Sequence, residues 1–323
     1  MSSLARGSQM ELRWDPLLRE WIIVSGVRRS RPMYPEGYCP FCPGAEEVPL
    51  SGWRVLSLPN RFPSLVTDAP TPDLSGDRLY RVRRAQGACE IVVYTPQHNT
   101  SLAQLAEDHV EAVVDLWAER FKALGSRDDA RYVLIFENKG REVGVTLDHP
   151  HGQIYAFPFI PPRIERELTS SRSYWKRRGD CLFCRILEKE RAQGVRLIAE
   201  NESFTAFLPF FARLPYGVHI YPRRHLQTLL DFTAEERRGF ALILRTVLKK
   251  FDRMFEGSFP YMMVFHQAPT DGREYPYYHF HAEFYPPYRE RGKLKFFASV
   301  ETGAGTVTFD YRPEDKAEEL RDA

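Results

Sequence analysis

Two cysteine pairs stand out as residues whose type and spacing could carry chemistry. They are Cys39-Pro-Phe-Cys42 and Cys181-Leu-Phe-Cys184, two near-copies of a Cys-x-x-Cys pattern. This spacing is typical of metal-binding knuckles and of redox centres, and a redox centre would need only one such pair. Two copies in one chain therefore favour metal binding.

Histidines that could complete two tetrahedral zinc sites follow the cysteine pairs. A structural zinc ion is typically held by two cysteines and two histidines. The expected ligands are Cys39, Cys42, His98 and His149 in the first half, and Cys181, Cys184, His225 and His279 in the second. We expect both ions to be structural, because four protein ligands leave no open position for water.

The segment His149-Pro-His-Gly-Gln153 could provide a nucleophile beside the first metal site. In a strand, residues two apart point to the same face, so His149, His151 and Gln153 would share a side. His151 could attack phosphorus while the Gln153 amide holds the developing oxyanion. Gly152 would let a bulky group approach the backbone closely. The alternative is a pair of structural strand histidines that are hydrogen-bonded to the backbone.

These residues recur in the same order along the chain, which indicates a tandem duplication. His149 and His279 are 130 residues apart, and the two cysteine pairs are 142 residues apart. The first half therefore carries the longer insertion between its cysteines and its histidines. We predict two halves, residues 1–165 and 166–323.

One long helix and a set of strands must position the candidate residues in each half. The helices are predicted to begin at the capping patterns Ser101-Leu-Ala-Gln104 and Thr233-Ala-Glu-Glu236, and Gly257 is expected to close the second. Predicted strands lie at 132–136, 153–157, 261–265 and 280–284. The charged residues 302–323 should form a surface helix or a loose tail. The expected fold class is α+β, a tandem duplication of a half with an antiparallel sheet and one long helix.

Composition and charge exclude several classes of protein. The chain has 323 residues, 45 Lys+Arg against 43 Asp+Glu, and 43% hydrophobic residues. A disordered chain would be less hydrophobic, and a nucleic-acid binder would usually be strongly basic. No apolar run has the length of a membrane span, and the N-terminus lacks the apolar core of a secretion signal. We expect a cytoplasmic protein with no nucleic-acid or membrane partner.

Six segments carry a resemblance to a known family. They are Arg28-Arg-Ser-Arg-Pro32, Pro59-Asn-Arg-Phe-Pro63, Phe136-Glu-Asn-Lys-Gly140, His149-Pro-His-Gly-Gln153, Phe259-Pro-Tyr261 and Phe284-Tyr-Pro-Pro287. With them the chain resembles the galactose-1-phosphate uridylyltransferase family, a branch of the histidine-triad superfamily built from two such halves. The likeness runs from Trp21 to about Glu301, nearly the whole chain.

The resemblance implies an enzyme that moves UMP from UDP-glucose to galactose 1-phosphate through a uridylyl-histidine intermediate. His151 matches the nucleophile of the family, and Gln153 matches the residue that binds the transferred phosphoryl group. The positions that bind the sugar nucleotide are matched by Arg28, Arg31, Asn60, Asn138, Gly144, Thr146, Gln153, Lys295, Phe296 and Glu301. Thr146 stands where the family commonly has serine. A homodimer that completes the site across its interface is also implied.

The resemblance also offers an alternative set of ligands for the second metal. The matching positions are Glu167, His266, His281 and Glu283, and family members that use this set have a histidine in place of Glu283 and lack the second cysteine pair. Thiolates bind zinc better than a mixed carboxylate set does. We therefore favour the two cysteines and two histidines of the second half.

Two other functions stay open from the sequence. An ADP-glucose phosphorylase or a dinucleoside-polyphosphate phosphorylase of the same fold would keep His151 and use phosphate as acceptor, and some phosphorylases of this branch also have a second zinc knuckle. No residue tells uracil from adenine. A non-catalytic, zinc-stapled nucleotide- or nucleic-acid-binding module is a remoter alternative. The net charge of +2 and the complete His-Pro-His-Gly-Gln motif argue against it.

Overall fold

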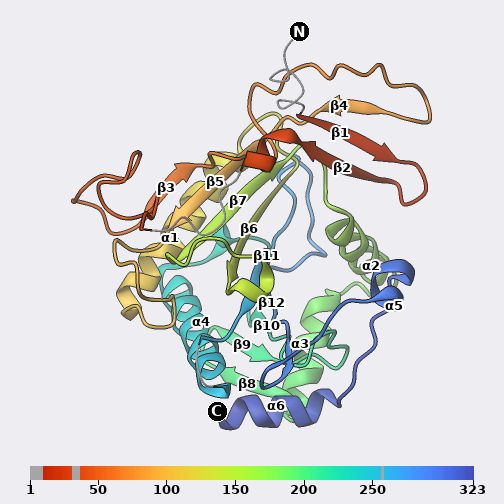
Figure 1. Cartoon of the computed structure of the whole chain (residues 1–323). Helices are drawn as coiled ribbons and strands as arrows, with labels where there is room; N and C mark the ends of the chain where they lie inside the picture. Colours follow the sequence, from red (N-terminus) through yellow and green to blue (C-terminus); the bar gives the residue numbers. More distant parts are fainter. Residues whose placement is uncertain (1–9, 31–36, 256–257) are drawn as a thin grey trace.

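One large antiparallel sheet organises the protein in this computed structural model, which describes residues 10–30, 37–255 and 258–323 (Figure 1). From edge to edge, the order of its strands is β3 (Leu56–Pro59), β5 (Ala88–Val93), β7 (His151–Phe157), β6 (Tyr132–Lys139), β11 (Tyr261–His266), β12 (His281–Tyr285), β10 (His219–Pro222), β9 (Phe204–Phe207) and β8 (Leu197–Glu200). The four predicted strands are therefore confirmed as β6, β7, β11 and β12.

The two halves of the chain meet in the middle of this sheet. Strands β6 and β11 pair antiparallel, with Val264 opposite Phe136. Moving outward from this pair, β7 and β12 occupy matching positions, and so do β5 and β10. The duplicated α+β architecture is thus confirmed, and its halves are related by an approximate twofold arrangement.

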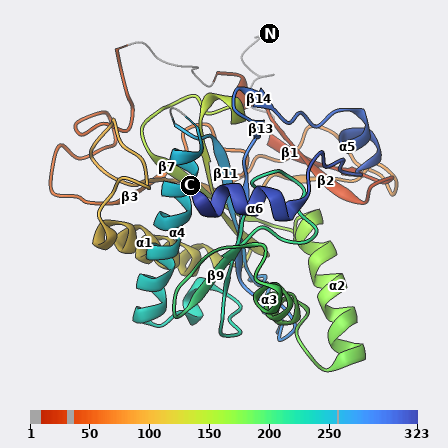
Figure 2. The ribbon, with the colours of Figure 1, turned by 90° about the horizontal axis from the view of Figure 1, so that it is seen from below.

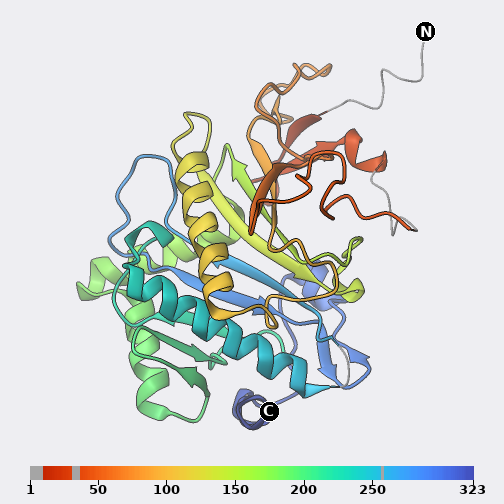
Figure 3. The same ribbon diagram turned by 90° about the vertical axis from the view of Figure 1, so that its left-hand side faces the viewer.

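Helices α1 (Glu107–Gly125) and α4 (Ala234–Met254) lie side by side on one face of the sheet (Figure 3). They bury apolar side chains every three or four residues, as an amphipathic helix must to cover a sheet. The Trp117 ring of α1 meets the Phe265 ring of β11 edge-on, with centroids 5.0 Å apart. The largest hydrophobic core therefore spans both halves of the chain.

The predicted N-terminus of α4 is correct, whereas that of α1 is not. Thr233 caps α4 as expected, because its side chain accepts from the Glu236 N–H while Glu236 binds the Thr233 N–H. The prediction at Ser101 is wrong, because α1 begins only at Glu107. Ser101 forms a separate turn in which its carbonyl accepts from the N–H groups of Gln104 and Leu105, and the buried Leu105 anchors that turn in the core. Gly257 lies outside the described residues.

Helices α2 (Pro162–Arg178) and α3 (Leu182–Gln193) pack on the opposite face of the sheet. Their buried residues Ile164, Leu168 and Phe183 form a second core with Tyr132 of β6. The proline at the start of α2 suits the first helical turn, where its missing N–H has no intrahelical partner to lose. None of the helices within the described ranges is both long and apolar enough to cross a bilayer.

Smaller elements surround the main sheet. They are the sheet of β2 (Glu20–Ser25), β1 (Met10–Asp15) and β4 (Val82–Arg84), the pair β13 (Tyr288–Glu290) and β14 (Lys293–Leu294), helices α5 (Ser299–Ala304) and α6 (Pro313–Asp322), and the 3-10 turns η1 (Gly26–Ser30), η2 (Arg141–Val143) and η3 (Leu229–Asp231). Figure 2 shows the C-terminal end of α6 lying next to α4. Ala317 and Leu320 of α6 are fully buried, so the charged C-terminal segment includes a docked surface helix.

Candidate functional site

The predicted metal ligands of the first half come together where β5 ends and β7 begins. The ligand atoms of Cys39, Cys42, His98 and His149 all lie within 4.8 Å of one another. The Cys42 sulfur is 3.5 Å from His98 Nδ1, and the Cys39 sulfur is 3.7 Å from His149 Nδ1. Tetrahedral zinc with ordinary bond lengths to sulfur and nitrogen separates such atoms by about 3.5 Å. The four side chains therefore fit one tetrahedral metal ion.

The second ring nitrogen of His149 orients its imidazole in this group. His149 Nε2 lies 2.8 Å from the main-chain oxygen of Thr95, so its N–H donates there and the Nδ1 lone pair faces the sulfurs. Burial lowers the pKa of His149 and keeps the ring neutral, as a metal ligand must be. A carbonyl partner of this kind fixes the tautomer of a ligating histidine.

The second half repeats this arrangement with its own residues. The Cys184 sulfur is 3.4 Å from the Nδ1 atoms of both His225 and His279, and Cys181 completes the group. His279 Nε2 is 3.1 Å from the Pro222 carbonyl, the same type of contact that His149 makes to Thr95. The fold thus forms two clusters of matching chemistry, as the spacing of the cysteines and histidines predicted.

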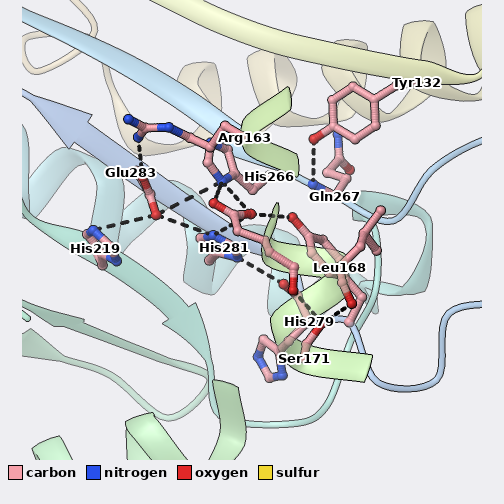
Figure 4. Close-up of polar contacts among 12 residues, drawn as sticks. Tyr132, Arg163, Leu168, Ser171, His219, His266, Gln267, His279, His281 and Glu283 are labelled. Carbon is pink, nitrogen blue, oxygen red and sulfur yellow. Dashed lines mark hydrogen bonds and ion pairs between the residues drawn. The ribbon is translucent and has the colours of Figure 1, made fainter. Parts of the chain in front are cut away.

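The alternative second ligand set forms a third, separate cluster (Figure 4). His266 Nδ1 lies 3.1 Å from the Glu167 carboxylate, and His281 Nε2 lies 3.4 Å from Glu283 Oε1. His281 Nδ1 also donates to the main-chain oxygen of His279 at 2.9 Å, which places this cluster directly beside the second one. The two ligand sets are therefore neighbours, and one does not exclude the other.

His151 is held in the tautomer that a nucleophile requires. Its Nδ1 lies 2.7 Å from the main-chain oxygen of His149, so the Nδ1 proton donates to that carbonyl and the ring lone pair is on Nε2. The residue is 8% exposed. Phe41, inside the first cysteine pair, packs against it with ring centroids 4.9 Å apart. The strand, the metal cluster and Phe41 together limit the orientations of this ring.

Two adjoining cavities of about 390 and 340 Å³ lie beside His151 and share Arg28, His151 and Gln153 as lining residues. Four more of the predicted substrate-binding residues line them: Asn60 and Thr146 the larger, Asn138 and Gly144 the smaller. The Thr146 hydroxyl is buried and has no hydrogen-bond partner in the described parts of the chain. A polar ligand atom in the cavity would satisfy that hydroxyl.

Three other predicted substrate-binding residues, Lys295, Phe296 and Glu301, are not brought to these cavities. Lys295 and Phe296 line a separate groove of about 530 Å³ on the α2 side of the sheet, beside Met262 and Val264. The Lys295 ammonium is 3.2 Å from the carboxylate of Glu301. Arg31 lies outside the described residues. Neither of the two cavities that contain Arg28 and Gln153 is lined by Lys295, Phe296 or Glu301.

Three residues near His151 were not predicted from the sequence. The sequence around Phe41 indicates only metal binding, because this residue lies between the two cysteines of a pair. Tyr155 could have been found, since it lies four residues after His151 on β7 and alternation puts both on one face. Ser64 had no sequence signal, because it lies in a loop that only the fold brings to the cavity.

Gly152 is required by the core behind the strand. A Cβ at this position would lie 2.2 Å from the Tyr94 hydroxyl, and the Tyr94 ring packs against Trp117 of α1. The bulky group expected at Gly152 is therefore a tyrosine on the helix side of the sheet. Opposite Gly152 on β6 lies Glu137, which is 3% exposed and accepts from the Tyr261 hydroxyl at 2.9 Å. Burial raises the pKa of Glu137 to about 7.

Comparison with known proteins identifies one family over most of the chain. The family model described as "Galactose-1-phosphate uridyl transferase, N-terminal domain" matches residues 6–161, and its C-terminal counterpart matches residues 167–303. The galactose-1-phosphate uridylyltransferase of Thermotoga maritima is 44% identical over 97% of this chain and 98% of its own length. That of Rattus norvegicus is 32% identical over 99% of this chain and 90% of its own.

Solved structures show the same relationship in three dimensions. A structure described as "Structure of uridylyltransferase" superposes with a TM-score of 0.89 at 42% identity, covering 97% of this chain and 98% of that one. An ADP-glucose phosphorylase from Arabidopsis thaliana, solved with bound ADP-glucose, has a TM-score of 0.75 at 23% identity and covers 98% of this chain and 99% of that one. The second likeness is one of fold alone.

Proposed function

The chain belongs to the galactose-1-phosphate uridylyltransferase family, and on this premise we propose that it transfers UMP from UDP-glucose to galactose 1-phosphate. The products are UDP-galactose and glucose 1-phosphate, so the enzyme is a UDP-glucose–hexose-1-phosphate uridylyltransferase. The observation that carries the proposal is the hydrogen bond from His151 Nδ1 to the His149 carbonyl. It leaves the lone pair on Nε2 in a residue that lines both cavities with Gln153.

In the first step His151 acts as the nucleophile. Its Nε2 attacks the α-phosphorus of UDP-glucose, a P–N bond forms, and the bond from that phosphorus to the bridging oxygen breaks. Glucose 1-phosphate leaves with the bridging oxygen. The Gln153 amide and the Arg28 guanidinium donate to the non-bridging oxygens, where negative charge accumulates. A guanidinium matches phosphate oxygens in both charge and geometry.

In the second step galactose 1-phosphate takes the uridylyl group. One of its phosphate oxygens attacks the same phosphorus, the P–N bond breaks, and His151 returns to its neutral form. A covalent intermediate divides one difficult displacement into two easier ones. The hydrogen bond from Nδ1 to His149 favours the same tautomer at the end of the cycle as at its start.

Zinc is the metal that suits the two cysteine-containing clusters. Two thiolates and two imidazoles at tetrahedral separations are the donor set that zinc prefers, and all four positions are taken by the protein. Zinc here would fix the loops that carry Phe41 and His149 and would supply no open position to a substrate. The cluster of Glu167, His266, His281 and Glu283 offers only nitrogen and oxygen donors and ranks behind these two.

The proposed enzyme is a homodimer that completes each active site with residues of its second subunit. Phe296 is 72% exposed beside an apolar groove, and Lys295 and Glu301 lie away from the cavities around His151. A second copy could bring these residues over the nucleotide. We propose residues 1–165 and 166–323 as the two halves, and a reducing cytoplasmic location, which suits a chain whose five cysteines form no disulfide.

The intact mass of the protein tests the proposed function directly. The enzyme is incubated with UDP-glucose or with ADP-glucose, separately and without an acceptor. A UMP-sized adduct that galactose 1-phosphate discharges is the expected result. An AMP-sized adduct discharged by inorganic phosphate would instead establish a phosphorylase, and no adduct with either nucleotide would contradict the covalent mechanism.

A further inference from the structure

Arg28 lines both of the adjoining cavities that His151 and Gln153 also line. One nitrogen of its guanidinium, Nη1, donates to two hydroxyl groups, that of Ser64 at 3.0 Å and that of Tyr155 at 3.1 Å. The three residues come from the turn η1, the loop after β3 and the strand β7. Segments far apart in the sequence thus meet at this one side chain.

The two hydroxyl groups are held much more firmly than the arginine. Ser64 is 7% exposed. The Tyr155 ring packs against Phe136 at 5.2 Å and Phe157 at 5.9 Å between centroids. Burial raises the pKa of Tyr155, so its hydroxyl stays neutral and can accept from the guanidinium. Arg28 itself is an exposed residue.

An exposed arginine side chain samples many rotamers, and fixing it in one of them costs rotamer entropy. The hydrogen bonds to the Ser64 and Tyr155 hydroxyls offset this loss of entropy before a substrate binds. They use one of the three guanidinium nitrogens, and a bidentate contact to phosphate oxygens needs the other two. The arrangement therefore prepares Arg28 for a phosphate beside His151.

The second half contains the same arginine–tyrosine contact in a different electrostatic setting. Tyr285 lies four residues after His281, as Tyr155 lies four residues after His151, and it accepts from Arg163 Nη1 at 2.6 Å. Arg163 also lies 3.6 Å from the carboxylate of Glu283. Among the ion pairs formed by the described residues, none involves Arg28. The positive charge of Arg28 can therefore interact with an anionic ligand.

We propose that Tyr155, together with Ser64, is a positioning residue that holds the Arg28 guanidinium against the phosphoryl group that His151 receives. The inference rests on the proposed function, because it needs a phosphoryl group at His151. Tyr155 acts through Arg28 and does not touch the reacting atoms. His151, Gln153 and Tyr155 lie two residues apart along one face of β7. This strand therefore carries the nucleophile and the amide donor, and through Tyr155 it also positions the Arg28 guanidinium.

The test measures single-turnover formation of the UMP adduct from UDP-glucose in four proteins: wild type, Tyr155→Phe, Arg28→Lys and the double variant. Losing one hydrogen bond to a charged group should slow adduct formation ~10-fold in Tyr155→Phe. Arg28→Lys should be slower still. Adding Tyr155→Phe to Arg28→Lys should cause no further loss, because lysine lacks the guanidinium that Tyr155 orients. Equal losses from Tyr155→Phe in both backgrounds would overturn the proposal.

Two further variants separate positioning from folding. Ser64→Ala should slow adduct formation several-fold and should lose this effect in the Arg28→Lys background. Tyr285→Phe is the matched control, since it removes the corresponding hydroxyl of the second half, and it should form the adduct at the wild-type rate. A similar slowing in Tyr285→Phe would contradict a role specific to Arg28. Failure of the wild-type enzyme to form any adduct would instead contradict the proposed function.

Discussion

The main-chain oxygen of His149 lies 2.7 Å from Nδ1 of His151, while Nδ1 of His149 faces the sulfurs of Cys39 and Cys42. One residue therefore belongs to the metal cluster through its side chain and to the nucleophile through its backbone. A movement of the cluster would be transmitted to the imidazole that attacks phosphorus. An ion bound by these four side chains would therefore affect the nucleophile without contacting a substrate.

Replacing His151 with glycine should abolish nucleotidyl transfer. Without the imidazole no P–N bond can form, so we expect kcat to fall by at least ~1000-fold, in the range seen when a nucleophile is removed. The zinc content, measured by inorganic mass spectrometry, should equal that of the wild type, because His149 remains in place. Retained activity in His151→Gly would show that another residue is the nucleophile.

Each chain should contain two zinc ions. Cys39→Ser should lose one of them and slow transfer ~10- to 100-fold, the usual effect of disturbing the shell around a functional group. Cys181→Ser should also lose one zinc ion and lower the thermal midpoint, while the UMP adduct still forms. A third equivalent of metal in the wild type would show that Glu167, His266, His281 and Glu283 bind an ion as well.

Phe41 should support catalysis in a way that its counterpart Phe183 does not. The two rings make matching contacts, Phe41 to His151 at 4.9 Å and Phe183 to His281 at 5.0 Å between centroids. Because a ring pair contributes about 0.5–1.5 kcal/mol beyond burial, Phe41→Leu should lower kcat up to ~10-fold. Phe183→Leu is the matched control for the loss of a buried ring. Equal effects of both variants on kcat would exclude a specific role for Phe41.

Glu137 should make stability depend on pH. Its pKa is raised from 4.5 to about 7 by burial, against the opposing effects of Tyr261, Lys139 and Tyr94 and with a smaller contribution from Asp252. The folded chain therefore holds this proton more tightly than the unfolded chain. Stability from this group is full below about pH 4.5, falls as the pH rises towards 7, and is constant above that.

A Glu137→Gln variant isolates this contribution. The difference in unfolding free energy between wild type and variant should change by roughly 3 kcal/mol between pH 4.5 and pH 8, because one pKa unit corresponds to about 1.36 kcal/mol. Urea unfolding at several pH values measures it. Parallel pH profiles for the two proteins would show that Glu137 has an ordinary pKa in the folded state.

The parts of the fold and site that could be read from the sequence are those set by local spacing. Short-range spacing was enough to predict the roles of the cysteine pairs, His149, His151 and Gln153. The repeat of these motifs predicted a duplicated sheet. The central pairing of β6 with β11 had no such signal, since it joins strands more than a hundred residues apart. The false start at Ser101 arose because a hydroxyl three residues before a glutamine also occurs in an isolated turn.

The contacts of Arg28 within the site also could not be predicted from local sequence spacing. An arginine near phosphate was expected, but its two hydroxyl partners depend on how β7 and the loop after β3 meet in space. The third cluster was expected only as an alternative to the second. Their coexistence follows from the backbone contact between His279 and His281, which sequence spacing alone does not describe.

The pairing of β6 with β11 has a consequence for how the two halves could diverge. A single half would end in an open edge strand, and two identical copies joined along that edge would form a symmetric pair with two identical sites. Covalent linkage removes the requirement for identity, so each copy can change alone. One half has glutamine at 153, a neutral donor that suits an anion, whereas the matching position of the other half has Glu283, a carboxylate that suits a cation. Two linked halves can therefore carry different side chains, and so different chemistry, at matching positions. A symmetric pair of identical chains cannot.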